Sequence, residues 1–98
     1  MRLILYSKPG CHLCEGLYEK LEQIVQRGNI TPLELEVRDI TTREDWLLAY
    51  QYEVPVLFLN RRGAEEAEEE VVEKPLPRPS PRVGVPQLEK MLLQYLSI

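Results

Sequence analysis

The chain has 98 residues, of which 44% are hydrophobic and 29% charged, and its formal net charge is -4 at pH 7. This composition is ordinary for a globular protein, and the length suffices for one hydrophobic core, so we expect a single domain over residues 1–98. No apolar run approaches the ~18–20 residues of a membrane span, and the first residues lack the features of a signal peptide. We therefore expect a cytoplasmic protein that does not bind membranes. Acidic residues outnumber basic ones, and the arginines are scattered rather than clustered, so we do not expect nucleic acid as a partner.

The first third of the chain predicts a strand, a helix and a second strand. Residues 2–6 are apolar and β-prone, and the Ser-Lys-Pro-Gly turn at residues 7–10 ends them. A helix is predicted from Cys11 to about Gly28, since glycine readily takes the left-handed cap conformation. Residues 33–38 alternate between apolar and polar types, which predicts a half-buried strand. The positions predicted to face the core are Leu13, Leu17, Leu21, Ile24 and Val25 of the helix and Leu33, Leu35 and Val37 of the strand.

The middle of the chain predicts a short helix followed by a buried strand. Thr41 and Glu44 have the capping-box spacing that marks a helix start. The continuous apolar run at residues 54–59 is typical of a strand that is covered on both faces. Pro55 should lie at the very start of that strand, because proline cannot donate a hydrogen bond to a sheet ladder. The apolar face of the helix is formed by Trp46, Leu47 and Tyr50.

The last part of the chain predicts a hairpin and a covering helix. A turn is expected at residues 60–63 and a glutamate-rich edge strand at residues 69–74, where charge would block edge-to-edge pairing. The last helix is predicted over residues 86–97, because apolar side chains recur there on a single face and proline suits the first position. This face is formed by Leu88, Met91, Leu92, Tyr95 and Leu96. Together the elements predict an α/β fold. A βαβ unit with parallel strands precedes a ββα unit, and they form a mixed four-stranded sheet flanked by three helices.

The two cysteines of the chain, Cys11 and Cys14, are three positions apart at the predicted start of the first helix. Unpaired backbone N–H groups and the helix dipole favour an anion there, and so lower the pKa of a thiol. Cys14, one turn further on, is close enough to attack a mixed disulfide formed at Cys11. The spacing therefore predicts thiol–disulfide exchange, with Cys11 as the nucleophile and Cys14 as the resolving thiol.

Two other interpretations account for the cysteines less well. A structural zinc site needs four ligands, whereas the chain offers two cysteines and one histidine, His12, all inside the motif. Two ordinary core cysteines would fit the spacing, but the strand–turn–helix context is the one typical of redox motifs. We therefore expect no metal ligands in this chain.

Two residues beside the predicted nucleophile carry or can carry positive charge. His12 follows Cys11 and, when protonated, would favour the Cys11 thiolate; this tunes the redox potential more than it transfers protons, since nothing orients the imidazole. Lys8 lies three positions before Cys11 and would add positive charge near the thiolate. A solvated turn lysine explains Lys8 equally well.

Residues 6–14, YSKPGCHLC, resemble the active-site segment of glutaredoxins, and Val54-Pro55 resembles their valine–cis-proline pair. The match is closest to short glutaredoxin-like proteins that have C-H-L-C in place of C-P-Y-C. The resemblance implies a thioredoxin-like fold in which Pro55 is cis and faces the dithiol across the substrate groove. It also implies that Lys8 binds the glycyl carboxylate of glutathione and that Val54 pairs with the glutathione backbone.

The chain departs from the glutaredoxin pattern around the glutathione groove. Glu53 stands where the family usually has threonine, and the family's Gly-Gly and following Asp have no clear counterpart. The proline-rich residues 74–84 take their place and suggest a stiff connector to the last helix. Arg78 or Arg82 in this connector could hold a carboxylate in a bidentate pair. Glutathione use therefore stays open, whereas dithiol chemistry does not depend on it.

The sequence thus predicts a thiol–disulfide oxidoreductase that reduces protein disulfides or glutathione mixed disulfides. We expect a monomer without a bound cofactor, with glutathione as a candidate co-substrate and a disulfide-containing protein as the partner. The alternative is a binding or redox-switch module of the same fold with little turnover. As in some glutaredoxins, such a module could carry an iron–sulfur cluster between two subunits, ligated by Cys11 and glutathione.

Overall fold

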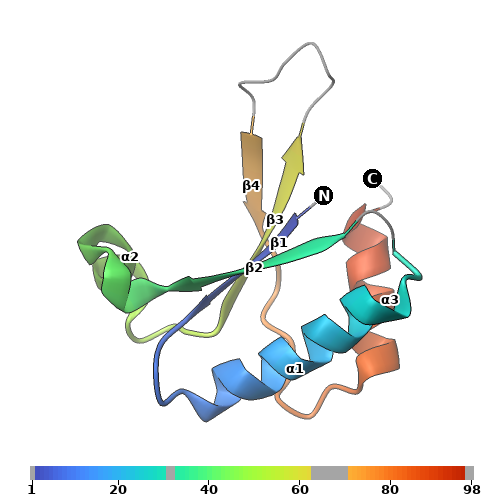
Figure 1. The fold of residues 1–98 in the computed structure, drawn as a ribbon, viewed down its shortest axis with the longest axis horizontal. Helices are drawn as coiled ribbons and strands as arrows, with labels where there is room; N and C mark the ends of the chain where they lie inside the picture. The colour runs from blue at the N-terminus through green and yellow to red at the C-terminus, as the bar shows by residue number, and fades with distance from the viewer. Residues whose placement is uncertain (1, 31–32, 63–70, 97–98) are drawn as a thin grey trace.

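The structure, a computed structural model, describes residues 2–30, 33–62 and 71–96 (Figure 1). The predicted order of strands and helices is confirmed, and a short 3-10 helix, η1, is added between the second strand and the second helix. None of the helices in the described ranges is long and apolar enough to cross a membrane. The elements are β1 (Arg2–Ser7), α1 (His12–Arg27), β2 (Glu34–Asp39), η1 (Ile40–Thr42), α2 (Glu44–Tyr50), β3 (Val56–Arg62), β4 (Val71–Pro75) and α3 (Val85–Leu96).

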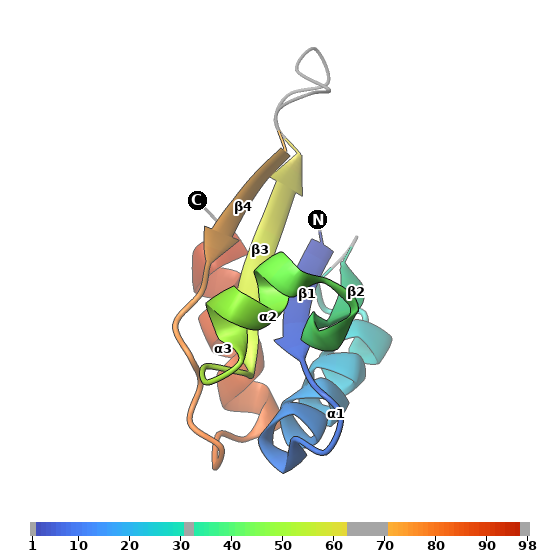
Figure 2. The same ribbon diagram turned by 90° about the vertical axis from the view of Figure 1, so that its left-hand side faces the viewer.

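The described strands form a four-stranded mixed sheet in the order β2-β1-β3-β4. Strand β1 pairs with β2 in parallel, and the β1–β3 and β3–β4 pairs are antiparallel. Helices α1 and α3 cover one face of the sheet, and α2 covers the other (Figures 1 and 2). The parallel pair joined by α1 and the antiparallel pair followed by α3 are the two units that the sequence predicts.

The main core lies between the sheet and helices α1 and α3. Alternate residues of β1 and β3 point into it, and the helices contribute side chains at three- and four-residue spacing, as the periodicity predicts. Each leucine or isoleucine that is fully buried in this way stabilises the fold by roughly 1.5–3 kcal/mol. Its members include Leu3, Leu5, Leu57 and Leu59 of the sheet, Leu17, Leu21 and Ile24 of α1, and Leu88 and Leu92 of α3.

A second, smaller core lies under α2. Ile4 and Tyr6 of β1 are buried there together with Ile40, and the predicted apolar face of α2 packs on them. Val56 and Phe58 of β3 contribute from the sheet, while their neighbours in the strand face the main core. Both faces of β3 are thus covered, which explains why residues 54–59 are apolar without interruption.

Three side chains that were predicted to lie on core-facing positions are exposed instead, namely Leu13, Val37 and, at 37%, Tyr95 of α3. The exposed fraction of Leu13 is 56% and that of Val37 is 44%. Leu13 lines the cavity between α1, Pro55 and residues 78–81, and Val37 lines a second cavity between α1 and β2. Periodicity identifies the face of an element correctly here, but it does not show how far along the element its neighbours extend.

The predicted capping box at the start of α2 is wrong. Asp39 Oδ1 accepts hydrogen bonds from the backbone N–H of Thr41 at 2.9 Å and from its hydroxyl at 2.6 Å, and so caps η1. The Thr41 hydroxyl is therefore engaged with Asp39 and does not cap a later turn. Helix α2 begins at Glu44 after Arg43, which makes no side-chain cap hydrogen bond.

The boundaries of the hairpin also differ from the prediction. Strand β3 continues to Arg62, so residues 60–62 pair with β4 rather than form the turn. Strand β4 begins at Val71, and the other residues of the predicted turn and edge strand lie outside the described ranges. The expected end of α1 is confirmed, because Gly28 has a φ of 71° and its N–H donates to the carbonyl of Val25.

Candidate functional site

Cys11 and Cys14 form a disulfide at the N-terminus of α1, with their Cα atoms 5.2 Å apart. The turn after β1 brings Cys11 to this position. Gly10 has a φ of 79°, a conformation that side-chain-bearing residues rarely adopt, and the Cys11 N–H closes the turn on the carbonyl of Lys8 at 3.3 Å. Residues 8–10 therefore turn the chain sharply enough for α1 to begin directly beside the end of β1.

Cys11 is the N-cap residue of α1. Its Sγ accepts a hydrogen bond from the backbone N–H of Cys14 at 3.2 Å. A negative charge on this sulfur would be stabilised by that N–H and by the helix dipole. The two cysteines also differ in accessibility, because Cys11 is half-buried whereas only 2% of Cys14 is exposed. An incoming disulfide can therefore reach the sulfur of Cys11 more readily than that of Cys14.

The Val54–Pro55 peptide bond is cis. Pro55 is buried and, with His12 and Leu13, lines one cavity, so it lies on the same side of α1 as the residues between the cysteines. The N–H of Val54 donates to the carbonyl of Tyr50 at 3.1 Å.

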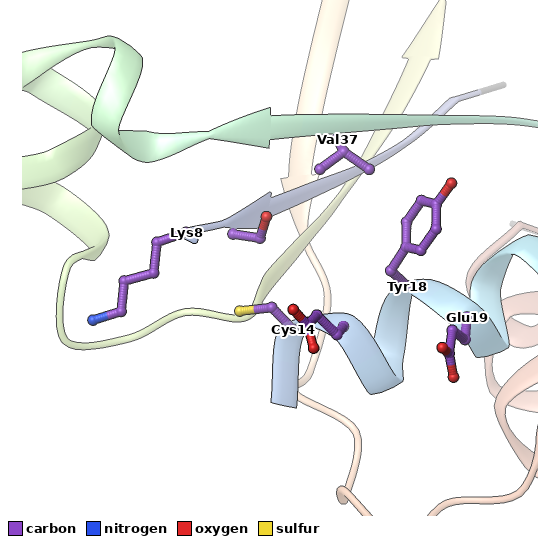
Figure 3. Close-up of a pocket in the computed structure, with 7 residues that line it drawn as sticks. Lys8, Cys14, Tyr18, Glu19 and Val37 are labelled. Atoms are coloured by element: carbon purple, nitrogen blue, oxygen red, sulfur yellow. The ribbon is translucent and has the colours of Figure 1, made fainter. Parts of the chain in front are cut away.

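The structure places the two tuning candidates differently. The side chain of His12 is 95% exposed, and its Nδ1 lies 3.6 Å from Glu15 Oε2. Lys8 Nζ instead donates to the carbonyl of Gln51 at 3.2 Å, and its side chain points away from Cys14 towards the end of α2 (Figure 3). His12 is thus next to the disulfide, whereas Lys8 connects the first turn to the end of α2.

Cavities lie on both sides of the first turns of α1. One, of about 500 Å³, is bordered by Lys8, Cys14, Tyr18 and Val37 on the β2 side (Figure 3). The other, of about 320 Å³, lies between α1, Pro55 and residues 78–81. Of the two arginines that the sequence offered as carboxylate ligands, Arg78 lines this second cavity. Arg82 lines neither of the two.

Several residues that border these cavities were not predicted from the sequence. Tyr18 and Lys20 were assigned no role, and Val37 was predicted to face the core. Gly16 offers a weak signal, because glycine lowers the stability of a helix interior and so stands out there. A Cβ built at Gly16 would have no atom within 4 Å. Among the described residues, no group of three or more His, Cys, Asp or Glu side chains could hold a metal ion.

Comparison with solved structures supports the thioredoxin-like architecture. Thioredoxin 1 from Thermosipho africanus aligns with a TM-score of 0.59 and 14% identity over 99% of this chain and 96% of its own. A structure described as a malarial protein aligns with a TM-score of 0.61 and 11% identity, over 97% and 96%. At such low identity these two neighbours show the fold alone.

A third solved structure is more similar in sequence. The structural-genomics target protein XcR50 from X. campestris is 27% identical, with a TM-score of 0.52 over 92% of this chain and 93% of its own. No curated protein matches the chain. The family model described as "Glutaredoxin-like domain (DUF836)" matches residues 2–93. The chain therefore belongs to this glutaredoxin-like family and has a thioredoxin-like fold.

Proposed function

We propose that the protein is a thiol–disulfide oxidoreductase that reduces disulfides in proteins or mixed disulfides with glutathione. The observation that carries the proposal is the pairing of Cys11 with Cys14 at the N-terminus of α1, where the cap N–H contacts the more accessible sulfur. The family match and the fold support redox chemistry at this pair.

In the proposed reaction the reduced protein supplies two electrons. The Cys11 thiolate attacks one sulfur of the substrate disulfide, forms a mixed disulfide and releases the other sulfur as a thiolate. Cys14, after losing its proton to solvent, then attacks the Cys11 sulfur, which breaks the mixed disulfide and releases the second thiol. The products are the Cys11–Cys14 disulfide and two substrate thiols. Protonated His12, exposed beside the motif, would favour the starting thiolate.

The protein must then be reduced again, by glutathione or by another dithiol protein. Glutathione binding of the kind that the family resemblance implies uses Lys8 and Val54. In this structure Lys8 Nζ donates a hydrogen bond to the Gln51 carbonyl, and the Val54 N–H donates one to the Tyr50 carbonyl. Both hydrogen bonds would have to break before these donors could bind glutathione. We place the reaction in a reducing compartment, the cytoplasm, with the protein acting as a monomer and without a bound cofactor.

The test is reduction of a small mixed disulfide, measured with glutathione and glutathione reductase and, separately, with a thioredoxin reductase system. We expect turnover with at least one reductant, and loss of that turnover in Cys11→Ser, because serine is not a nucleophile in this exchange. Cys14→Ser should accumulate a mixed disulfide at Cys11, which mass spectrometry detects. The proposal fails if Cys11→Ser is as active as the wild type. It also fails if reduced wild-type protein transfers no electrons to any disulfide, a result that would favour a binding module.

A further inference from the structure

The cavity between α1, Pro55 and residues 78–81 opens beside the dithiol, because His12 and Leu13, which lie between the two cysteines, line it. Given the proposed function, on which this inference rests, an occupant of the cavity lies next to the disulfide under attack. The family resemblance already implies a substrate groove beside Pro55; we propose that in this chain the cavity selects protein substrates by the segment that flanks their reducible cysteine. It takes an apolar side chain of that segment, and Arg78 pairs with a carboxylate of the same segment.

The walls of the cavity fit an apolar side chain. Leu13 and Leu17 of α1 face Pro55 and the proline rings of residues 79 and 81 across it. More than half of Leu13 is exposed, although it lies one helical turn before the buried Leu17. Covering such a side chain is favourable by about 25 cal/mol for each Å² removed from water. A volume of about 320 Å³ is small for a ligand site and fits one or two side chains rather than a whole folded surface.

The wall formed by residues 78–81 limits how a carboxylate can be held. Two of these four residues, Pro79 and Pro81, are prolines, which have no backbone N–H to donate. The carbonyl of Pro81 accepts a hydrogen bond from Lys20 Nζ at 2.9 Å, which ties this segment to α1. The wall therefore offers proline rings, carbonyl oxygens and the Ser80 hydroxyl, and Arg78 is its charged side chain.

Arg78 is the charged side chain that remains available. His12, Lys20 and Arg78 line the cavity, and no acidic side chain is found among its described lining residues. Lys20 is engaged with Pro81, and His12 lies beside Glu15. Arg78 is exposed and makes no hydrogen bond or ion pair with any residue in the described ranges. A guanidinium binds carboxylates with two parallel hydrogen bonds, so an acidic residue near the substrate cysteine complements this site.

The inference is tested with matched peptides in a single-turnover assay. Each peptide has a cysteine flanked on both sides by leucine and then by glutamate, glutamine or lysine, and the cysteine is joined by a disulfide to a coloured small thiol. The prereduced protein releases that thiol, so no reductant is needed. We expect the glutamate peptide to react about fivefold faster than the glutamine peptide at low salt, and the difference to shrink as salt screens the charges. The net charge of -4 on the protein would repel the glutamate peptide and make it react more slowly than the glutamine peptide. A faster reaction of the glutamate peptide must therefore come from a positive charge close to the dithiol.

Arg78→Gln should reduce the ratio of the glutamate rate to the glutamine rate towards one. Arg82→Gln is the matched control, because Arg82 does not line the cavity, and it should keep the wild-type ratio. Equal rates for the glutamate and glutamine peptides in the wild type would overturn the inference and leave the proposed function intact. A ratio unchanged by Arg78→Gln would overturn the assignment to Arg78. If the protein also fails to reduce the symmetric disulfide of the coloured thiol, which carries no peptide, that result would instead contradict the proposed function.

A second variant tests whether the peptide occupies the cavity. A side chain at Gly16 projects into free space, and glycine inside a helix is unfavourable, so Gly16→Leu should fold at least as stably as the wild type. The added side chain fills part of the cavity that the leucine of the peptide would take. We expect the leucine-flanked peptides to react more slowly in Gly16→Leu than in Gly16→Ala, which restores helix propensity but adds only a methyl group. Equal rates in these two variants would show that the peptide binds elsewhere.

Discussion

At the scale of single residues, Cys11 serves the local fold and the proposed chemistry through one contact. As N-cap of α1 it accepts the backbone N–H of Cys14, the third residue of the helix, which is the usual partner of a cap side chain. The same hydrogen bond is stronger to a thiolate than to a thiol. The spacing of the two cysteines therefore places the second cysteine's N–H, as well as its sulfur, next to the first sulfur.

Asp39 gives a pH-dependent prediction at the same scale. Hydrogen bonds from the hydroxyl and the backbone N–H of Thr41 lower the pKa of Asp39. Because the folded state favours the ionised form, its stabilising effect is present above the unfolded pKa of about 3.9 and is lost as pH falls through the lower folded pKa. Asp39→Ala should unfold at lower urea concentration than the wild type near neutral pH, and the difference should narrow below about pH 4. A constant difference across this range, in urea titrations, would show that the ionised carboxylate is not what stabilises η1.

At the scale of elements, α3 holds the C-terminal end of α1 in place. Glu89 of α3 is 9% exposed, and its Oε1 accepts a hydrogen bond from Asn29 Nδ2 at 3.2 Å. Arg27 Nε lies 3.8 Å from the other carboxylate oxygen. The residues on either side of the Gly28 cap thus both contact one acidic side chain, and α1 is anchored at the end opposite to the dithiol.

The packing of α3 predicts a large loss of stability on truncation. Leu88 is fully buried in the main core, so Leu88→Ala should lower the free energy of unfolding by about 2–5 kcal/mol, the loss that a cavity of this kind causes. Leu93→Ala on the same helix is the control, because Leu93 is 44% exposed and its truncation leaves little cavity. Urea unfolding followed by circular dichroism measures both variants. Equal losses would mean that α3 does not pack through Leu88 in solution.

At the scale of the whole molecule, Arg38 connects the outer strands on the face that α2 covers. Its guanidinium donates to the Tyr6 hydroxyl at 2.7 Å, to Glu36, and to both carboxylate oxygens of Glu73 at 3.4 Å. It also lies 5.5 Å from the ring centres of Tyr6 and Trp46. Burial lowers the pKa of Arg38, but its hydrogen bonds with Glu36 and Tyr6 outweigh this effect and raise the pKa above its usual range. One side chain therefore links β2, β1, β4 and α2.

Removing this connection should cost more than removing an exposed ion pair. Arg38→Met keeps the apolar stem but leaves Glu36 and Glu73 without their shared partner, and we expect the free energy of unfolding to fall by about 1.5–3 kcal/mol. Arg43→Met is the control, because it removes an ion pair that is exposed on both sides, and such pairs contribute little to stability. The Arg43 guanidinium also lies 4.8 Å from the centre of the Trp46 ring, so both variants lose a cation–π contact with this ring and the comparison isolates the hydrogen bonds of Arg38. Thermal and urea unfolding would check both. A loss in Arg38→Met no greater than in Arg43→Met would mean that the network is a surface feature without a role in holding the sheet.

Much of the fold and the reactive pair could be predicted from the sequence, because they depend on neighbours along the chain. Periodicity located the helices and strands, a glycine marked the end of α1, and the turn before Cys11 placed that residue at a helix start. The η1 helix was missed because Asp39 and Thr41 cap locally in a pattern that competes with the capping box. The exposure of Leu13 and Val37 was missed because it depends on where other elements end.

By itself, the sequence determined the order of the elements and the position of Cys11 and Cys14 at a helix N-terminus, since local sterics, hydrogen bonding and side-chain periodicity decide both. Only the tertiary structure decided which distant groups meet around that pair. It joined Lys8 to the end of α2 and placed Arg78 across a cavity from the first turns of α1. These contacts bring together residues that are more than forty positions apart in the chain. The conformational preferences of neighbouring residues do not determine these contacts, because the contacts result from the packing of whole elements against one sheet.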